Sequence, residues 1–406
     1  MSNRQGVWSL VAQYQAIADQ DWTMAPGAPT GVSATAGNAQ ATVAFSAPSF
    51  TGIPAGITGF KVTSSEGETA TGSASPITVT GLTNGTSYTF SVQAQNAIGF
   101  GAASSNSSSV SPAAPIGMFF GGESSSNRLD TVNKVTLGTT GNATDFGNLT
   151  AALHSAAGLA STTRAITTGG SEASATNEIN YKSWSSSGNF FDFGNLNVGR
   201  QGHGGCGSST RGVSMMGDSG EASMEYITLA STGNGTDFGD SASVGGGLAT
   251  SCSSDTRGIA FRGGFIGSSY TNSIEYITIA NTGNASDFGD MLNAMTSIGV
   301  AASNKTRGIH FGGYYNNPTE KVNVIQYITI ASTGDATDFG NLAGVTFFGG
   351  ACAGETRALR AGGDGRSNEI SYVTIASTGD STDFGDLTYS LARRCGGTSS
   401  NHGGLQ

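Results

Sequence analysis

An aspartate and an arginine recur at a nearly fixed separation through residues 116–406. The aspartate opens six Asp-Phe-Gly tripeptides, and an arginine follows nineteen or twenty residues later in five copies. Opposite charges at constant spacing can form charge-assisted hydrogen bonds, and a ring of them could instead bind a charged ligand. Because the pattern recurs in every copy, a structural pairing within or between repeats is favoured. The pairs are Asp145–Arg164, Asp192–Arg211, Asp237–Arg257, Asp287–Arg307 and Asp338–Arg357, with His402 following Asp383.

The segment in which the repeats differ in length is the second candidate for chemistry. Between a Gly-Gly pair and the following tyrosine, the gap is nine residues after Gly363, twelve after Gly264 and fourteen after Gly313. Insertions confined to one kind of loop map to one face of a repeat protein, often its binding face. Tyrosine and asparagine on such loops suit saccharide or protein surfaces, and the alternative is a solvated loop without a ligand. The candidate binding residues are Phe265, Tyr270, Tyr314, Tyr315, Asn316 and Asn317.

The cysteines occupy a repeat position rather than a metal-binding cluster. Cys206, Cys252 and Cys352 each precede the repeat arginine by five residues, and Leu159 and Ala302 take that place elsewhere. A position shared by Cys, Leu and Ala predicts a small core site with free thiols, because equivalent positions lie too far apart to pair. Metal ligation around a central axis is the alternative. We expect no metal and no cofactor.

Familiar catalytic patterns are missing from the sequence. The Asp-Phe-Gly tripeptides have neither a phosphate loop nor a His-Arg-Asp motif beside them, and the four histidines occupy unlike repeat positions. A calcium site at the turn containing Asp335 and Asp338 is an alternative that lacks the spacing of a calcium loop. We therefore expect a protein that is not an enzyme; a propeller glycosidase or lyase would need a non-repeating acidic or histidine cluster.

The repeated phrase predicts the elements that position these residues. The tyrosine at Tyr226 opens YITLASTGNGTDFGD, and related phrases start at Lys134, Tyr181, Tyr276, Tyr327 and Tyr372. Six units of 45 to 51 residues suit the four-stranded antiparallel blades of a β-propeller. The last repeat lacks the strand after SSNHGGLQ, and MFFGG from Met118 supplies it. We therefore predict a six-bladed ring over residues 116–406, closed by N- and C-terminal strands.

Two segments precede the repeats. In residues 1–25, Leu10 and Tyr14 follow helical spacing, and Trp8 and Trp22 flank them, which predicts a helical arm that docks on a partner. The alternative is a helix packed on its own neighbouring domain. Residues 26–115 alternate apolar and polar residues between short turns, which predicts a β-sandwich.

Three resemblances extend this all-β prediction. The run GLTNGTSYTFSVQAQNAIGFG from Gly81 resembles a fibronectin type III domain; the Leu82 to Tyr88 spacing matches its tyrosine corner, and Phe45 replaces its usual tryptophan. The Gly-Gly pairs resemble kelch-type propellers. The repeated phrase also resembles repeat proteins of phage virions and tails. That last resemblance implies a virion structural protein, such as a tail fibre, appendage or decoration protein, with adhesin-like host attachment.

Composition limits the partners. The net charge of −10 without a basic run argues against nucleic acid, and no apolar stretch is long enough to cross a membrane. The N-terminus does not resemble a signal peptide. The resemblance implies other tail or capsid proteins as partners, multiple copies or a homo-oligomer, and a host glycan or protein as a further partner. The expected location is the virion, assembled in the host cytoplasm. A carbohydrate-binding propeller module of a cellular protein is the alternative.

Overall fold

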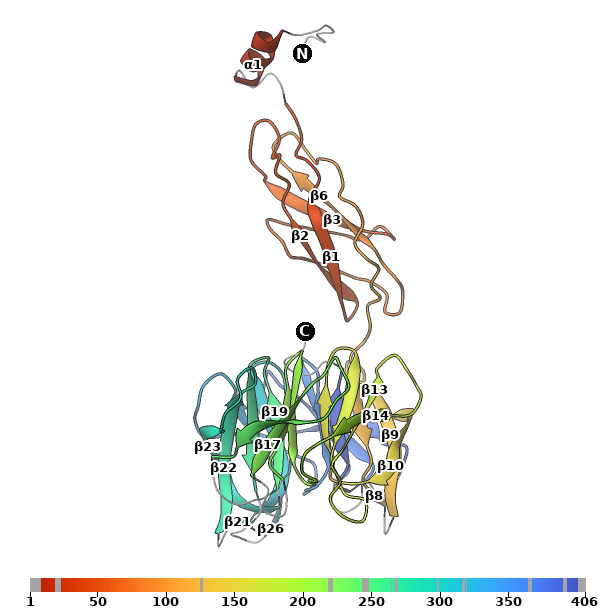
Figure 1. Cartoon of the computed structure of the whole chain (residues 1–406), viewed down its shortest axis with the longest axis vertical. Helices are drawn as coiled ribbons and strands as arrows, with labels where there is room; N and C mark the ends of the chain where they lie inside the picture. Colours follow the sequence, from red (N-terminus) through yellow and green to blue (C-terminus); the bar gives the residue numbers. More distant parts are fainter. Residues whose placement is uncertain are drawn as a thin grey trace. The chain divides into compact units, whose positions relative to one another are not determined.

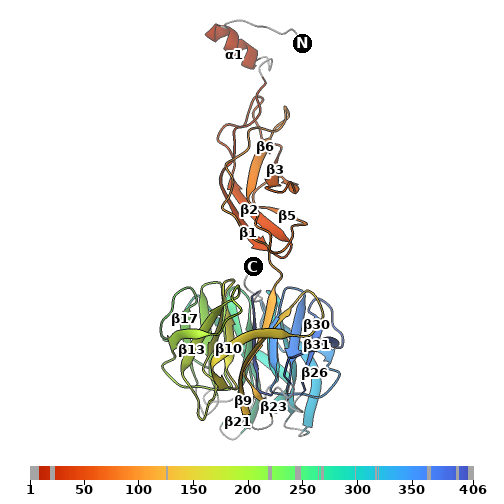
Figure 2. The ribbon, with the colours of Figure 1, turned by 90° about the vertical axis from the view of Figure 1, so that its right-hand side faces the viewer.

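A computed structural model, shown in Figures 1 and 2, gives the structure of the chain. It forms two compact units, Met1–Ala114 and Pro115–Gln406. No helix among the described residues is long and apolar enough to span a membrane. The described residues are 9–18, 23–124, 127–217, 222–242, 248–263, 265–266, 269–297, 299–315, 318, 320–363, 367–389 and 393–400.

The first unit contains one helix and a two-sheet sandwich. Its sheets have the strand orders β1-β2-β5 and β4-β3-β6. Alternating exposure along β3 and β6 follows from the two-residue period of a strand with one buried face. The elements are α1 (Leu10–Ala18), β1 (Thr30–Gly37), β2 (Gln40–Ser46), β3 (Gly59–Ser64), β4 (Thr69–Gly72), β5 (Ile77–Thr80) and β6 (Phe90–Gln95).

The core of the sandwich contains the aromatic residues that the sequence places there. Phe45 is buried with its ring centroid 4.8 Å from that of Phe60. Tyr88 is also buried, and its hydroxyl accepts a hydrogen bond from the Thr83 amide at 3.0 Å. This bond provides a partner for the one polar atom of a core tyrosine and fixes the turn before β6.

The second unit consists of antiparallel strands in repeating groups of four. We call the groups sheets 1 to 6; β23 also pairs with β25, so sheets 4 and 5 form one continuous nine-stranded sheet. Sheet 1 contains β32 (Gly396–Ser399), β7 (Ile116–Phe120), β9 (Asn127–Thr136) and β10 (Thr144–Leu153), and the short β8 (Glu123–Ser124) pairs with β9. Sheet 2 contains β11 (Ala157–Ala160), β12 (Arg164–Thr168), β13 (Glu178–Ser183) and β14 (Phe191–Asn195). Sheet 3 contains β15 (Gly204–Gly207), β16 (Arg211–Met215), β17 (Ser223–Thr228) and β18 (Thr236–Asp240).

The remaining three groups follow the same order. Sheet 4 contains β19 (Ala249–Ser253), β20 (Arg257–Arg262), β22 (Ser269–Thr278) and β23 (Ser286–Ser297), and β21 (Phe265–Ile266) pairs with β22. Sheet 5 contains β24 (Val300–Ser303), β25 (Arg307–Tyr315), β26 (Glu320–Thr329) and β27 (Thr337–Asn341). Sheet 6 contains β28 (Gly350–Ala353), β29 (Arg357–Ala361), β30 (Glu369–Thr374) and β31 (Thr382–Asp386).

Sheet 1 combines the two ends of the repeat region. Strand β32 pairs antiparallel with β7, with Gly396 opposite Phe120 and Ser399 opposite Gly117. The Ser400 amide donates to the Ile116 carbonyl, and the Ile116 amide donates to Ser400 Oγ, both at 2.8 Å. In sheet 2 the same two bonds link Ser161 and Arg164 across a continuous turn. Two hydrogen bonds thus replace a covalent connection, and the predicted pairing of the two ends is confirmed.

The first strands of the six sheets contact one another in a circle. β11 contacts β15, and the series continues through β19, β24, β28 and β32 back to β11. Figures 1 and 2 show the sheets side by side in the second unit. Apolar residues fill the spaces between neighbouring sheets; one cluster joins Phe119 of sheet 1 to Leu359 of sheet 6. Burial of these faces is the main stabilising contribution.

The repeated phrase forms a clasp between each sheet and the next. In sheet 4, the Phe288 carbonyl accepts from the Gly334 amide at 2.7 Å, and the Asp290 amide donates to Asp335 Oδ1 at 3.0 Å. The phrase therefore holds the outer strand of one sheet to the turn of its neighbour. Gly289 has a φ of 148°, and a Cβ there would lie 2.4 Å from the Gly334 carbonyl oxygen, so this position requires glycine.

All four cysteines are buried and free, as the repeat position predicts. Burial raises the pKa of the Cys252 and Cys395 thiols to about 12, with only partial compensation from neighbouring groups. Because the thiolate is the reactive species, thiols in this environment are inert core groups.

Candidate functional site

Among the described residues, the repeat arginines bond to backbone carbonyls and not to the repeat aspartates, so the predicted pairing is wrong about the partner. The Arg211 guanidinium lies 4.3 Å from the ring centroid of Tyr226, and its Nη1 donates to the Ile279 carbonyl of the next sheet at 2.9 Å. Arg164, Arg257 and Arg307 repeat this arrangement with the next sheet in order. Each arginine therefore links two sheets, as predicted, but its partners are a backbone carbonyl and an aromatic face and not an aspartate.

The aspartates lie on the outermost strands, away from these arginines. All of them are exposed: Asp145, Asp192, Asp237, Asp287, Asp338 and Asp383. Arg357 stacks on Tyr372 at 4.6 Å, but its Nη1 has no hydrogen-bond partner within the described part of the chain. The place that corresponds to the arginine in sheet 1 is occupied by Ile116, and His402 lies outside the described residues.

The length-variable loops share one end of the second unit with a cavity. Each such loop joins the second and third strands of a sheet, and in sheet 2 the end of β12 at Thr168 pairs with the start of β11 at Ala157. Ala157 lines a cavity of about 340 Å³. Figure 1 shows β8 and β21, which flank two of these loops, at the same end of the unit. We call this end the loop face.

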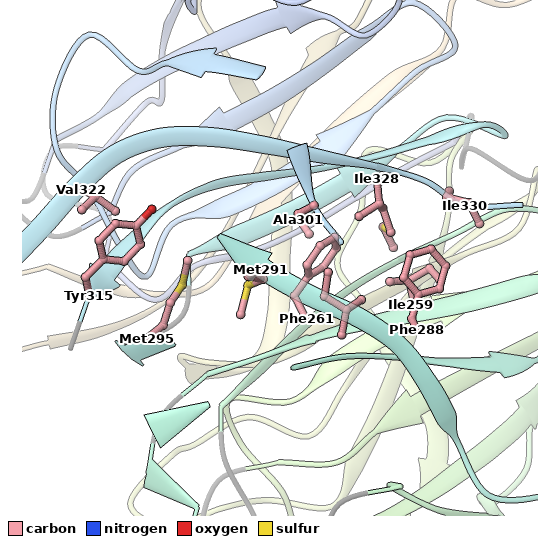
Figure 3. Packing of buried hydrophobic residues seen from close by; sticks show 13 residues of the cluster. Ile259, Phe261, Phe288, Met291, Met295, Ala301, Tyr315, Val322, Ile328 and Ile330 are labelled. Atoms are coloured by element: carbon pink, nitrogen blue, oxygen red, sulfur yellow. The ribbon is translucent and has the colours of Figure 1, made fainter. Parts of the chain in front are cut away.

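The predicted binding residues have different environments on the loop face. Tyr270 is 38% exposed. Tyr314 is half-buried, with its ring centroid 5.6 Å from that of Phe347. Tyr315 is buried in a core cluster beside Met295, as Figure 3 shows, so its predicted surface role is wrong. Asn316 and Asn317 lie outside the described residues. The backbone of Phe265 pairs with Tyr270, and its side chain is likewise outside what is described.

The cavity lies where the first strands begin. Its polar lining comes from Ser155, Gln201, His203, Thr250, Ser251 and Arg394, and its walls include Gly158, Gly204, Gly350 and Gly397. Each of these glycines belongs to a first strand that pairs on only one side, so backbone amides and carbonyls line the space. Across the described ranges, no group of three or more His, Cys, Asp or Glu residues is placed to hold a metal ion.

A chain of backbone hydrogen bonds surrounds part of the cavity mouth. The Arg394 amide donates to the Phe348 carbonyl at 2.6 Å, the Ser155 amide to the Arg394 carbonyl at 2.8 Å, and the Gly202 amide to the Ser155 carbonyl at 2.9 Å. All four residues have left-handed backbones, with φ between 55° and 59°. Each stands two residues before a first strand. The left-handed residue therefore turns the chain into the first strand and links it to its neighbour.

Aromatic and cationic side chains gather beside this mouth. Phe347 and Phe348 are half-buried, with ring centroids 4.8 Å apart. The guanidinium of Arg394 lies 4.9 Å from the Phe348 ring, and its Nε lies 3.7 Å from Glu123 Oε1. Arg393 approaches the same carboxylate at 3.9 Å. We call Phe347, Phe348, Arg393 and Arg394 the rim.

The length pattern of the sequence points to the loops before each tyrosine and not to the rim. The rim lies in the short segments that precede β28 and β32, where the repeats do not differ conspicuously in length. One pattern in the sequence could have indicated the rim. The repeat position that holds Gly202 before β15 holds Phe348 before β28 and Arg394 before β32.

Two buried histidines predict that the second unit loses stability in acid. His203 Nε2 lies 3.0 Å from Thr168 Oγ1, and its Nδ1 has no partner among the described residues. Burial, aided by the charge of Arg200, lowers the pKa of His203 to about 3. Burial also lowers the pKa of His310 to about 3. Both histidines are therefore neutral in the folded protein at any pH above that value.

We expect the free energy of unfolding to fall as the pH drops below 6.5, the ordinary pKa of histidine. Below that pH the unfolded chain binds protons that His203 and His310 cannot accept when folded, which costs about 2 kcal/mol per histidine at pH 5. His203→Gln and His310→Gln should each reduce the loss of stability between pH 7 and pH 5 by that amount. Urea titrations of parent and variants at both pH values measure it; parallel losses would contradict the prediction.

The arm exposes the apolar residues that were predicted to dock. Leu10 is 72% exposed and Tyr14 is 71% exposed on α1, and Val11 lies between them with a similar exposure. These exposed apolar side chains are available to a partner. Trp8 and Trp22 lie outside the described residues.

Comparison with known proteins identifies one part of the chain. A search of curated proteins finds no match to the chain. The family model of the fibronectin type III domain matches residues 27–111, which coincide with the sandwich, its buried Phe45 and its Tyr88 hydrogen bond. Residues 27–111 of this all-β protein are a fibronectin type III domain.

Proposed function

We propose that the chain is a non-enzymatic structural protein of a tailed-phage virion, either a tail fibre or appendage or a decoration protein. In this proposal the arm attaches to another virion protein, and the fibronectin domain is a spacer. The six sheets are the blades of a kelch-like propeller that presents the loop face to a host surface. Two observations support this proposal: the described geometry, and the resemblance between the repeated phrase and phage repeat proteins.

The observation that carries the binding role is the rim beside the cavity. A concave site with a few convergent polar groups and aromatic walls is the usual form of a ligand site. The circle of first strands and the clasps between sheets support a rigid propeller, in which such a site would be held in place. The proposed location is the virion, with other tail or capsid proteins as partners.

The exposed residues of α1 support the docking role. An apolar side chain left in water on a short helix gains free energy when a partner covers it. We expect Leu10→Glu with Tyr14→Glu, and deletion of residues 1–25, to abolish incorporation into particles assembled in infected cells. Gln15→Glu is the matched control, because it adds a charge at another exposed position of the same helix and should leave incorporation unchanged.

Particle incorporation also separates the proposal from its alternative. A carbohydrate-binding module of a cellular protein would use the same rim but would not associate with particles. If the arm variants enter particles as well as the parent chain does, the docking role is wrong. If the chain never associates with particles yet binds glycans, the cellular module is the better interpretation.

A further inference from the structure

The clasp between neighbouring sheets uses an asparagine in four places and an aspartate in two. In each clasp, a backbone amide of one sheet's outer strand donates to Oδ1 of this residue at 2.9 or 3.0 Å. An amide and a carboxylate both provide such an oxygen, so either residue type can close the clasp. The six clasp residues are Asn142, Asn189, Asn234, Asn284, Asp335 and Asp380.

Asn234 is the one residue of this set that precedes a glycine; alanine, phenylalanine or serine follows the other five. The packing requires this glycine, because a Cβ added at Gly235 would lie 2.6 Å from Glu225 Oε2. The Glu225 carboxylate cannot move aside easily, since it is buried and accepts a hydrogen bond from the buried Arg200 guanidinium. The salt bridge of sheet 3 therefore creates an Asn-Gly pair in this clasp alone.

An asparagine that precedes a glycine is prone to deamidation, because no Cβ hinders the approach of the glycine nitrogen to the side chain. The Gly235 nitrogen bonds to Asn234 Cγ, the Cγ–Nδ2 bond breaks, and ammonia leaves with the proton of the Gly235 amide. Water then opens the five-membered imide that results. Cleavage of the new Cγ–N bond gives aspartate, and cleavage at the backbone carbonyl gives isoaspartate.

The closed clasp keeps the two reacting groups apart. The Gly235 amide donates to the Asn195 carbonyl at 2.8 Å, and the Asn195 amide donates to Asn234 Oδ1 at 3.0 Å. Gly235 is buried although Asn234 is exposed, so the nitrogen that must lose its proton is shielded from base. Attack on Cγ requires both hydrogen bonds to break, which means that the clasp between sheets 2 and 3 has to open locally.

We propose that Asn234 is a modification site whose deamidation is controlled by the opening of this clasp. Aspartate still offers an Oδ1 atom to the Asn195 amide, as Asp335 and Asp380 do in two other clasps. Isoaspartate routes the main chain through the former side chain, so its carboxylate and the following amide no longer match the Asn195 backbone. A brief opening can thus become a permanent break between two sheets. This inference does not depend on the proposed function.

Incubation of the full-length protein at pH 8, followed by peptide mapping with mass spectrometry, tests the inference. Asn234 should deamidate roughly 10-fold or more slowly in the folded protein than in urea that unfolds it, because the closed clasp blocks the reaction. Asn284 is the matched control. It closes the next clasp but precedes Ala285, so it should deamidate far more slowly than Asn234 in urea.

Two glycine substitutions separate the opening of this clasp from a general loss of stability. A Cβ at Gly194 would lie 2.4 Å from the Gly233 carbonyl oxygen, and a Cβ at Gly239 would lie 2.4 Å from the Gly283 carbonyl oxygen of the next clasp. Gly194→Ala should therefore raise the rate at Asn234 in the folded protein toward the rate in urea. Gly239→Ala opens the other clasp and should leave the rate at Asn234 at the parental value.

Equal rates at Asn234 in the folded and the unfolded parent protein would overturn the inference, because the clasp would then give no protection. Equal acceleration by Gly194→Ala and Gly239→Ala would also overturn it, because the reaction would then follow unfolding of the whole second unit. Absence of deamidation at Asn234 in urea would overturn it as well. The comparison of folded with unfolded parent protein decides the outcome even if Gly194→Ala does not fold.

Discussion

Replacing Gly308 with alanine is expected to lower the free energy of unfolding of the second unit by about 3 kcal/mol, as overpacking of a core does. An added Cβ would lie 2.7 Å from Cys252 Sγ and 3.1 Å from Ile328 Cγ1. The φ of Gly308 is not in the left-handed region, so the penalty is steric and not conformational.

The same substitution should become nearly harmless when the sulfur is removed. Cys252→Ala alone is expected to cost about 1–2 kcal/mol through a small cavity, and Cys252→Ala with Gly308→Ala about the same, which gives a coupling energy of roughly 2–3 kcal/mol. The chain already contains this combination, because Ala302 of sheet 5 and Ala358 of sheet 6 share one core cluster. Ala302 matches Cys252 in the repeat, and Ala358 matches Gly308.

Urea unfolding of the four members of this cycle measures the coupling. Gly138→Ala is the matched control, because an added Cβ there meets nothing within 4 Å and should change stability by no more than about 0.5 kcal/mol. Independent, additive effects of Cys252→Ala and Gly308→Ala would show that the two residues do not pack as described.

This cycle shows what a repeat position can and cannot reveal. The interchange of cysteine, leucine and alanine in the sequence correctly predicts a buried site. The interchange does not show that the residue after the repeat arginine must become smaller or larger to match this site. The two residues that contact each other belong to different sheets, and therefore to different repeats. Leu159 faces Gly212 and Cys352 faces Gly117 in the same way, so the size constraint acts between repeats.

The arginine bridges and the loop tyrosines show the same limit. Constant spacing indicates that each arginine has a structural partner, but a backbone carbonyl leaves no signal in the sequence, so the sequence points to the aspartate instead. For Tyr314 and Tyr315, strand alternation requires one inward and one outward side chain. The register shift between Phe311 and Gly313 interrupts the inward and outward alternation along β25. The alternation therefore cannot be extended from Phe311 to predict which tyrosine is buried.

Deleting residues 396–406 is expected to abolish the folded state of the second unit. The deletion removes β32, the only partner of β7 on that side, and uncovers Met118, Phe119 and Phe120, each of which is fully buried. Exposing a large apolar side chain costs about 1.5–3 kcal/mol, so three of them and the lost strand pairing approach the whole stability of a typical domain.

Calorimetry of the full chain and two truncations tests this expectation. Because the sandwich has its own core, its unfolding transition should survive the deletion of residues 396–406, while that of the second unit disappears. Deletion of residues 401–406 alone retains β32 and both hydrogen bonds between Ile116 and Ser400, and should preserve both transitions. A second-unit transition that persists without β32 would mean that the strand supplied by the C-terminus does not hold the ends of the repeat region together. Loss of that transition only when β32 is removed would place the stability of the second unit in the pairing between its first and last strands.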